Sequence, residues 1–553
     1  MTDTIQTAGS VSGHIVDVVN RRIGPGTVHF SSGRIERIEP ANDVPTQYVI
    51  PGFVDAHIHV ESTMLPPAEF ARWAAARGTV ATVSDPHEIA NVLGVSGVEY
   101  MLSEARRRPE FTILFGAPPC VPATVFETAG AELDAEAVRR LLARDDIGYL
   151  SEVMNVPGVL QGDPDLIAKL TAAREAGKPI DGHAPGLRGE GVRTYAAAGV
   201  STDHECTTIE EARERIDAGM WVVIREGSAA RDFEALAPLL FEAPDRLMFC
   251  SDDKHPNDLI RGHIDRLAAR AVSHGLDPIE ALRIACYNPL EHYGIKTGLL
   301  RPGDPANFVV VNDLYEFEPV TTWLNGQCVA RDGVPLLPYL TPDKLNRFRT
   351  TIPDISSLRL PLPPDKTIRA IAVRSGSLIT GEHRVASRHC TRDGEFRTNL
   401  ERDLLKIVVV NRYSDEPPAV AVVHGFGLKR GAIASSVAHD SHNVVALGVD
   451  DGSLLAAVAH VITAGGGVAV ARSPSEVDVL ALPIAGLMAV ESGDSVAEQY
   501  EAIENTARDL GCTLGSPMMT LSFTALLVIP ELKLSDRGLF DGRSFGFTPI
   551  VVD

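Results

Sequence analysis

The segment Pro51-Gly-Phe-Val-Asp-Ala-His-Ile-His-Val-Glu-Ser-Thr63 is the most informative part of this sequence for its fold class. It reads as a short apolar strand that ends in His57 and His59. Alternate residues of a strand face the same way, so both imidazoles can reach one metal ion. An isolated His-x-His arises easily by chance, and its meaning therefore depends on the segments that follow.

Seven further apolar runs follow the first at intervals of roughly 30 residues, with helical stretches between them, which is the βα rhythm of a parallel sheet. The eight runs are Phe53–His57, Val80–Ser84, Thr112–Phe115, Ile147–Ser151, Pro179–His183, Val200–His204, Trp221–Arg225 and Leu247–Ser251. Between the first two, Pro66–Ala75 has a Pro-Pro entry that suits a helix start. Eight βα units in about 245 residues predict an α/β fold built on a TIM-like (β/α)8 barrel.

The segments on either side of the barrel have a different texture, with short β-like pieces separated by Gly and Pro. We expect residues 1–50 and 296–345 to form one small β-sandwich from both flanks, and residues 51–295 to form the barrel. A Pro-, Thr- and Ser-rich linker is expected at 336–365, and a C-terminal α/β domain at 366–553. In that domain, Leu404–Val410 predicts a strand, and residues 453–464 and 495–510 predict helices.

Composition excludes several classes of protein. The 553 residues are 44% hydrophobic and 22% charged, which is typical of globular proteins. The net charge of −22 argues against nucleic-acid or anionic-membrane partners, because the field would repel both. We expect a cytoplasmic protein for three reasons. The seven cysteines are scattered and form no CxxC pair, the sequence shows no signal peptide, and it has no apolar run long enough to span a bilayer.

Polar residues recur where the predicted strands end. His57 and His59 end the first strand, Glu152 the fourth, His183 the fifth, His204 the sixth and Asp252 the eighth. TIM-barrel active sites are built at this carboxyl-terminal face. Structural histidines have no reason to choose the same end of successive strands, so we predict a metal site here.

The donor set constrains the metal. Four imidazoles and two carboxylates without a thiolate suit Zn²⁺, Mn²⁺ or Fe²⁺. Six ligands exceed the need of one tetrahedral ion, whereas two ions about 3.5–4 Å apart and bridged by a carboxylate would use all of them. Glu152 is the expected bridge. Asp252 can bind a metal and accept a proton from the attacking water, whose pKa the ions would lower towards ~7.

Longer strings around these residues resemble the amidohydrolase superfamily and, within it, the adenine deaminase family. They include Asp85-Pro-His-Glu-Ile-Ala-Asn-Val-Leu-Gly94, Asp181-Gly-His-Ala-Pro-Gly-Leu187, Ile224-Arg-Glu-Gly-Ser-Ala-Ala-Arg231, Ser251-Asp-Asp-Lys-His-Pro256 and, near the C-terminus, His439-Asp-Ser-His-Asn443 and Val528-Ile-Pro-Glu-Leu-Lys-Leu534. The resemblance covers almost the whole chain and is weakest before Pro51.

The resemblance implies hydrolysis of adenine to hypoxanthine and ammonia, in purine salvage, on two divalent ions per chain, Mn²⁺ first and Fe²⁺ or Zn²⁺ as alternatives. It implies that His57, His59, Glu152 and Asp252 hold one ion, that Glu152, His183 and His204 hold the other, and that Glu88 is the proton shuttle. It further implies a homo-oligomer, expected to be a dimer.

Other roles remain open at this stage. Glu88 can instead pair with a helix dipole after Pro86, and His87 can orient Glu88 or Asp252. Arg225, Glu226 and Ser228 are candidates for substrate binding, with a structural ion pair at the barrel rim as the competing interpretation. His439 and His442 are spaced i, i+3, in a loop that can reach the barrel mouth or have a purely structural role.

Three other functions compete with this one. Cyclic amide hydrolases on the same barrel usually bridge their metals with a modified lysine on the fourth strand, where this chain has Glu152 and its nearest lysines are Lys169 and Lys178. The single-zinc deaminases need H-x-E and P-C-x-x-C, and Pro119-Cys-Val-Pro-Ala lacks the second cysteine. A non-catalytic relative would have lost metal ligands. A modified adenine as the preferred substrate stays open.

Overall fold

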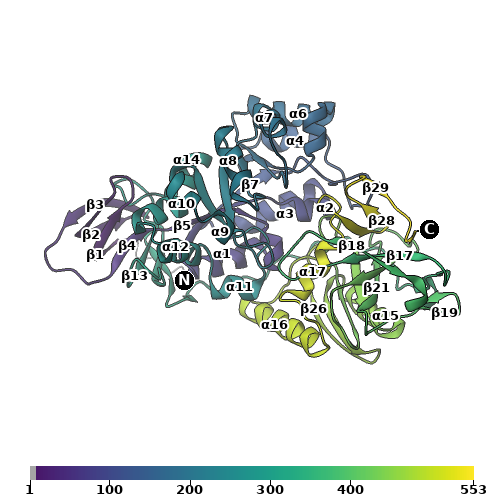
Figure 1. Ribbon diagram of the computed structural model, residues 1–553. Coiled ribbons are helices and arrows are strands. Elements are labelled where there is room, and N and C mark those ends of the chain that lie inside the picture. Colours follow the sequence, from purple (N-terminus) through teal and green to yellow (C-terminus); the bar gives the residue numbers. More distant parts are fainter. Residues whose placement is uncertain (1–7, 553) are drawn as a thin grey trace.

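The computed structural model describes residues 8–552. Three regions follow one another along an elongated molecule: a sheet at one end, a central region of alternating strands and helices, and a C-terminal domain at the other end (Figure 1).

The central region contains eight parallel strands, and each coincides with a predicted one. They are β5 (Phe53–Ile58), β6 (Thr79–Ser84), β7 (Thr112–Ala117), β8 (Ile147–Val153), β9 (Ile180–Gly182), β10 (Thr202–Asp203), β11 (Trp221–Arg225) and β12 (Leu247–Cys250). The strands pair in chain order, β5 to β9 in one sheet and β10 to β12 in another.

Backbone hydrogen bonds join the two parallel sheets at both edges. On one side the Ser201 N–H donates to the carbonyl of Ile180 at 2.8 Å, and on the other the Asp252 N–H donates to the carbonyl of His57 at 2.9 Å. Asp252 also forms a parallel bridge with Ile58. The curled sheet is therefore of the TIM-barrel type, and its carboxyl-terminal strand ends meet at one mouth.

Helices pack around this sheet (Figure 1). They are α1 (Pro67–Ala76), α2 (His87–Leu93), α3 (Val95–Ala105), α4 (Ala135–Leu142), α5 (Val156–Gln161), α6 (Pro164–Glu175), α7 (Glu190–Ala197), α8 (Ile209–Asp217), α9 (Phe233–Leu236), α10 (Leu239–Glu242), α11 (Pro256–Arg261), α12 (Ile264–Ser273), α13 (Pro278–Leu282) and α14 (Asn288–Tyr293). Helix α1 begins at a proline, as expected, and buries Phe70, Trp73 and Ala74.

The two flanks of the barrel meet in one eight-stranded sheet. The N-terminal flank supplies β1 (Gly9–Asp17), β2 (Arg22–Ser31), β3 (Arg34–Pro40) and β4 (Tyr48–Pro51). The other flank supplies β13 (Phe308–Val311), β14 (Pro319–Leu324), β15 (Gln327–Arg331) and β16 (Val334–Pro335). Strand β13 pairs antiparallel with β4, so that the two flanks join in a continuous sheet.

The segment expected to be a linker is an ordered connection that contacts both neighbouring parts. Arg72 on α1 donates to the carbonyl of Leu337 at 2.8 Å, and the Tyr100 hydroxyl donates to that of Asp343 at 2.8 Å. On the other side the Arg349 N–H donates to the carbonyl of Arg412 at 2.9 Å. The connection therefore attaches the C-terminal domain to the barrel by hydrogen bonds.

The C-terminal domain is built on a nine-stranded, mainly antiparallel sheet. Its strands are β17 (Thr367–Ala372), β18 (Gly381–Ala386), β21 (Leu404–Val410), β22 (Ala419–His424), β23 (Ala432–Ser435), β24 (Val444–Gly448), β25 (Gly467–Ser473), β26 (Glu476–Ala481) and β30 (Val551–Val552). Its helices are α15 (Asp451–Thr463), α16 (Gly493–Asp509) and α17 (Pro517–Phe523), so the strand and both helices predicted here are confirmed.

A hairpin and a small three-stranded sheet complete the domain. The hairpin consists of β19 (Thr391–Arg392) and β20 (Glu395–Phe396), and the sheet of β27 (Leu532–Ser535), β28 (Gly538–Asp541) and β29 (Gly546–Phe547). Among residues 8–552, no helix is both long and apolar enough to cross a membrane.

Candidate active site

Six side chains meet at the carboxyl ends of the barrel strands. They are His57, His59, Glu152, His183, His204 and Asp252, and all are buried. Strands β5 and β8 carry His57 and Glu152, and the other four residues follow directly after β5, β9, β10 and β12. The structure thus brings together all six predicted ligands, which come from five strands.

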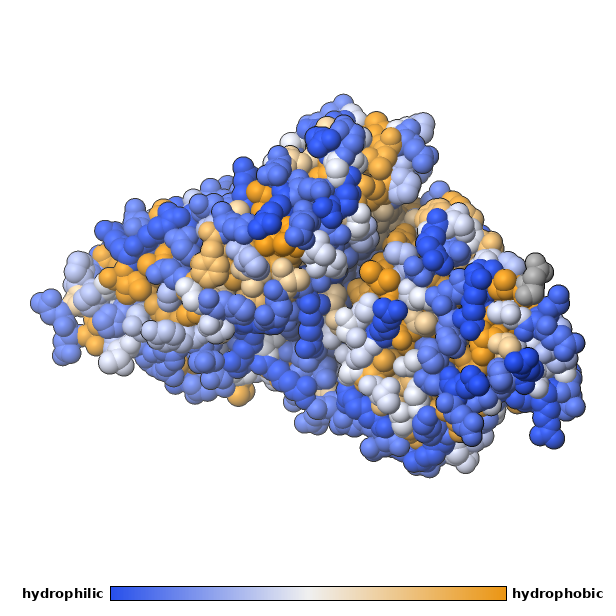
Figure 2. All heavy atoms as spheres, in the orientation of Figure 1, coloured by the Kyte–Doolittle hydropathy of each residue, from blue (hydrophilic) through white to orange (hydrophobic). Residues whose placement is uncertain are grey.

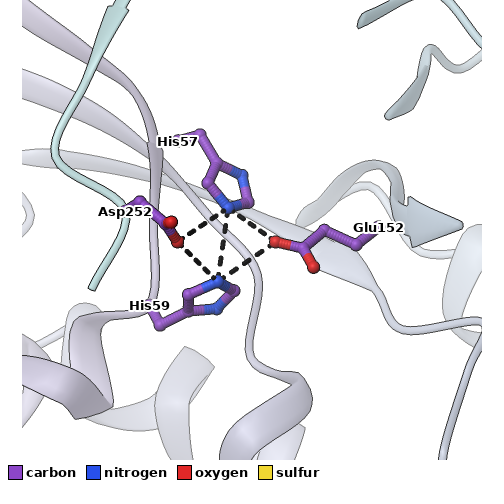
Figure 3. A group of neighbouring side chains, drawn as sticks. All are labelled: His57, His59, Glu152 and Asp252. Carbon is purple, nitrogen blue, oxygen red and sulfur yellow. Dashed lines mark hydrogen bonds and ion pairs between the residues drawn. The ribbon is translucent and has the colours of Figure 1, made fainter. Parts of the chain in front are cut away.

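Four of these side chains point toward one another around a common centre (Figure 3). The Glu152 Oε1 atom lies 2.7 Å from His57 Nε2 and 3.1 Å from His59 Nε2. The Asp252 Oδ1 atom lies 3.2 Å from His59 Nε2. The four ligand atoms are close enough to bind a single ion.

The remaining two histidines face the same glutamate from another side. His183 Nδ1 is 3.2 Å from Glu152 Oε2, and His204 Nε2 is 3.5 Å from Glu152 Oε1. Glu152 is therefore the one carboxylate shared by both groups, which is the position expected for a bridging ligand.

The donors fit a pair of divalent cations. Glu152 Oε1 and both ring nitrogens of His183 are buried without a hydrogen-bond partner among the described residues, which is costly unless something else satisfies them. His59 contacts the carbonyl of Asp85 through Nδ1 at 3.2 Å, which leaves Nε2 directed at Glu152. Although burial raises the pKa of Glu152, the surrounding imidazoles hold that pKa well below its ordinary value, so the carboxylate is ionised.

Buried aspartates, which the sequence did not single out, anchor the ligand loops. Asp85 accepts hydrogen bonds from the backbone N–H of His87 at 3.0 Å and of Glu152 at 3.2 Å. Asp55 accepts one from the N–H of Ser251 at 3.1 Å, next to Asp252. These bonds tie neighbouring strand ends together next to the predicted ligands.

The proposed acid–base residue Glu88 lies in the first turn of α2 and lines the same cavity as the ligands. His87 precedes it, and its Nδ1 is 3.1 Å from Asp85 Oδ2 while its Nε2 is 3.6 Å from Glu88 Oε1. His87 therefore lies between an anchored aspartate and Glu88, a position that suits orienting Glu88.

The loop between β23 and β24 of the C-terminal domain supplies two histidines that contact Glu88. His439 Nδ1 is 2.5 Å from Glu88 Oε1, and His442 Nε2 pairs with the other carboxylate oxygen. The Ala438 N–H donates to His442 Nδ1 at 3.2 Å, so the proton of a neutral His442 is on Nε2, facing Glu88. Burial raises the pKa of Glu88, but the two histidines hold it well below its usual range.

An apolar wall closes the cavity opposite the ligands. The cavity has an empty volume of about 330 Å³, part of it open to solvent, and Leu378, Phe523, Leu526 and Ile529 of the C-terminal domain line it. These four side chains pack with Met519 in one small cluster. Figure 2 shows a recess between the barrel and the C-terminal domain, with orange apolar residues beside it. A cavity with an apolar wall on one part and polar side chains on the rest suits a flat heterocycle with polar edges.

Of the three residues expected to bind substrate, only Arg225 lines the cavity. It is buried and pairs with Glu205, with Asp232 at 2.9 Å and with Asp252 at 3.1 Å. Its guanidinium thus holds a metal ligand in place.

Glu226 and Ser228 do not line the cavity, and substrate binding by them is not retained. Glu226 pairs with Arg270 on α12 at 2.8 Å. The Ser228 hydroxyl donates to Asp258 at 2.6 Å and accepts from the His255 N–H at 2.9 Å, so its hydrogen-bonding capacity is used in holding two loops together.

The chain matches known proteins along nearly its whole length. Residues 48–329 match the amidohydrolase family, and residues 377–546 match the adenine deaminase C-terminal domain. An adenine deaminase from Salinibacter ruber is 54% identical over 98% of this chain and 99% of its own. The chain belongs to the adenine deaminase family. Adenine deaminases from a Sulfurovum species and from Methanosarcina mazei are 52% and 48% identical over 96% and 98% of this chain, and over 98% and 99% of their own.

The lysines considered as alternative metal bridges are engaged elsewhere. Lys169 donates to the carbonyl of Pro119 at 2.9 Å and pairs with Asp165. Lys178 donates to backbone carbonyls, including those of Leu142 and Arg144, each at 2.7 Å. Neither lies among the ligand groups, which leaves Glu152 in the bridging position.

Glu205 is a cavity residue that sequence reasoning missed. It pairs with Arg225, and its Oε1 is 3.6 Å from His183 Nδ1. If the strand continued through these residues, successive side chains would point to opposite faces, and Glu205 would point away from its neighbour His204. Strand β10, however, ends at Asp203, so both residues lie in a loop and face the same cavity.

Proposed function

We propose that this protein hydrolyses adenine to hypoxanthine and ammonia. The observation that carries the proposal is the position of Glu152, which faces two pairs of histidines in a cavity that Glu88 also lines. Membership of the adenine deaminase family supports the choice of substrate.

Two divalent cations would be held by the buried ligands at the barrel mouth. His57, His59, Glu152 and Asp252 would hold one, and Glu152, His183 and His204 the other. When bound, such ions make a water molecule acidic enough to attack at neutral pH. We propose Mn²⁺ as the native metal, a choice supported by the imidazole and carboxylate donors and the absence of a thiolate from both groups.

The reaction requires proton transfers that Glu88 is well situated to perform. Water forms a bond to C6 of the purine, the C6–N bond breaks, and the amino group leaves as ammonia. An ionised Glu88 can accept the proton of the attacking water and give it to the adjacent ring nitrogen. The second water proton goes to the departing nitrogen. Asp252, which lines the same cavity, is the second proton acceptor in this proposal.

The contacts of Glu88 support this role. A general base must be ionised before the attack, and the paired His439 and His442 favour the ionised carboxylate. Because burial lowers the pKa of His442 and leaves it neutral, its Nε2–H donates to Glu88 without giving up a proton. The alternative role of Glu88 as a dipole-compensating residue does not require these two partners.

The apolar wall of Leu378, Phe523, Leu526 and Ile529 would bind the faces of the purine, which have no hydrogen-bonding groups of their own. A methyl group on the adenine nitrogen would have to fit the same narrow cavity, so modified adenines are included in the test as competing substrates.

A substrate panel tests the proposal directly. Metal-reconstituted protein is given adenine, N6-methyladenine, adenosine, guanine, cytosine or dihydroorotate, and ammonia release and absorbance are followed. We expect rapid ammonia release from adenine. Turnover of dihydroorotate alone would favour a cyclic amide hydrolase and reject the proposal, and preference for N6-methyladenine would redefine the substrate.

The Glu88→Gln variant tests the proton shuttle. The amide keeps the size of the side chain but cannot accept a proton, so we expect turnover to fall by about 10²–10⁴-fold with two ions still bound. Glu99→Gln, at an exposed position on α3, is the matched control. Loss of metal from Glu88→Gln would mean that Glu88 is a ligand instead.

A further inference from the structure

A second cavity lies against the same two loops that carry Arg225 and Asp252. These loops are tied together by the Glu226 N–H, which donates to the Cys250 carbonyl at 3.0 Å, and by the Ser228 N–H, which donates to the Asp253 carbonyl at 2.8 Å. Within the loops, neighbouring residues line different cavities. Arg225 and Asp252 line the active site, whereas Glu226 and Lys254 line the second cavity, which we call the basic pocket.

The basic pocket is cationic in a strongly acidic protein. It has an empty volume of about 620 Å³, part of it open to solvent, and five cationic side chains against two carboxylates line it. The cations are Arg231, Lys254, Arg261, Arg266 and Arg270, and the carboxylates are Glu226 and Asp258. Cations thus outnumber carboxylates among the lining residues, in a chain whose net charge is −22; Glu234, Glu501, Asp265, Glu316 and Glu318 lie around the pocket as partners of its arginines.

The five cations differ in how well they are paired. Arg270 and Arg261 form close ion pairs, with Glu234 and Glu501 respectively at 2.5 Å. Arg231 and Arg266 form only long ion pairs without hydrogen bonds to a carboxylate: Arg231 with Asp258 at 3.9 Å, and Arg266 with Asp265 and Glu318 at 3.7 Å and Glu316 at 3.9 Å.

Lys254 is the exceptional member of the set. Lys254 is only 8% exposed, yet its ammonium makes no hydrogen bond or ion pair with any residue among 8–552. Burying a charge without a partner costs several kcal/mol. The side chain lines the basic pocket, where a small anion can reach it.

We propose that the basic pocket binds a phosphate-bearing anion, with Lys254 as the central cation and Arg231 and Arg266 at the rim. Arginine matches phosphate oxygens in a bidentate fashion and lysine acts as a compact point charge, which is the combination found here. The volume admits a phosphate monoester and not only the inorganic ion.

Occupation of the pocket would act on the active site through the loop itself. Lys254 is two residues from Asp252, and the Asp253 side chain accepts a hydrogen bond from the Ser62 hydroxyl in the loop that follows His59. An anion on Lys254 would hold this segment in one position. Binding is a separate claim from the proposed deaminase activity, and either can fail without the other.

Calorimetric titration of the metal-loaded protein with inorganic phosphate and with glycerol phosphate, at constant ionic strength set with sodium chloride, tests the proposal. We expect saturable binding with a Kd below about 1 mM, weakened at least about tenfold in Lys254→Met. Lys344→Met, at an exposed position of the interdomain connection, is the matched control and should bind as the wild type does.

Two further measurements keep the test decisive. If Lys254→Met does not fold, the exposed pair Arg231→Gln and Arg266→Gln replaces it, with the same expected loss of affinity. Titration of metal-loaded Glu88→Gln, which should not consume adenine, in the presence of saturating adenine locates the anion, since binding at the basic pocket should persist. Displacement of phosphate by adenine, or an unchanged phosphate affinity in all variants, would overturn the proposal.

Discussion

Replacing Lys533 tests how the C-terminal domain forms the wall of the active site. Lys533 lies in β27 and is completely buried. Its ammonium donates to the carbonyls of Leu378 at 3.0 Å and Phe523 at 2.8 Å, two residues that line the catalytic cavity. No carboxylate among the described residues pairs with it, and burial lowers its pKa from 10.5 to about 7.

The size and sign of the effect follow from that pKa. Because the folded-state pKa lies below the unfolded value, the unfolded chain binds up to one more proton between pH 7 and about 10.5. The free energy of unfolding therefore rises with pH through this window, by at most about 1.4 kcal/mol per pH unit. The destabilisation of the folded state by the buried Lys533 ammonium is fully present below pH 7. Between pH 7 and pH 9 the predicted gain is about 2 kcal/mol, which for a domain of this size is roughly 4–8 °C in Tm.

Thermal unfolding of the wild type and Lys533→Met at several pH values from 7 to 9 measures this contribution. The difference in Tm between the two proteins should move in favour of the wild type as pH rises, because methionine has no proton to release. Lys366→Met, at an exposed position, should run parallel to the wild type. Parallel curves for Lys533→Met as well would refute the reasoning.

The same variant has a kinetic consequence. Without the ammonium, the carbonyls of Leu378 and Phe523 lose a buried hydrogen-bond donor, and the segments that carry the apolar wall are released from each other. We expect KM for adenine to rise several-fold with a smaller change in kcat, because the wall contacts the substrate and not the reacting atoms. A fall in kcat alone would place Lys533 in another role.

Three further predictions concern the polar half of the site. Glu152→Gln should reduce the metal content measured by elemental analysis, since one carboxylate faces both histidine pairs; retention of two ions would contradict a bridging role. His442→Gln should keep both ions but lower kcat/KM by about 10–10²-fold and shift the acid limb of its pH profile upward, because Glu88 loses a donor that lowers its pKa; an unshifted profile would argue for packing alone. Arg225→Met should destabilise the fold by about 3–5 kcal/mol in denaturant unfolding, since it leaves three carboxylates without their cation; a loss below about 1 kcal/mol would show that they are solvated.

Much of the barrel was predictable because its signals are local. A strand such as Trp221–Arg225 is recognisable from a few residues. Because barrel active sites lie at the carboxyl ends of the strands, six candidate ligands on five strands could then be predicted to lie together. The interdomain connection was harder to predict, because its order depends on partners such as Tyr100 on α3, far away in the sequence.

The errors at the site have the same origin. Glu226 follows Arg225 directly, and proximity in sequence suggested a shared role, but the chain leaves β11 at that point and Arg270 of α12 pairs with Glu226 on the other side of the loop. For His439 and His442, the sequence showed their i, i+3 spacing and a loop that can reach the barrel mouth, but not the residue they contact. Their partner Glu88 lies some 350 residues earlier, and no local pattern encodes that contact.

The contacts of Glu88 divide the two tasks of the site between the two domains. All six predicted metal ligands come from the barrel, whereas Glu88, the proposed acid–base residue and also part of the barrel, contacts histidines of the C-terminal domain and lines a cavity with an apolar wall from that domain. Glu88 meets His439 and His442 only across the interface between the two domains. The apolar wall of Leu378, Phe523, Leu526 and Ile529 also comes from the C-terminal domain, so this domain completes a cavity whose other side the barrel supplies.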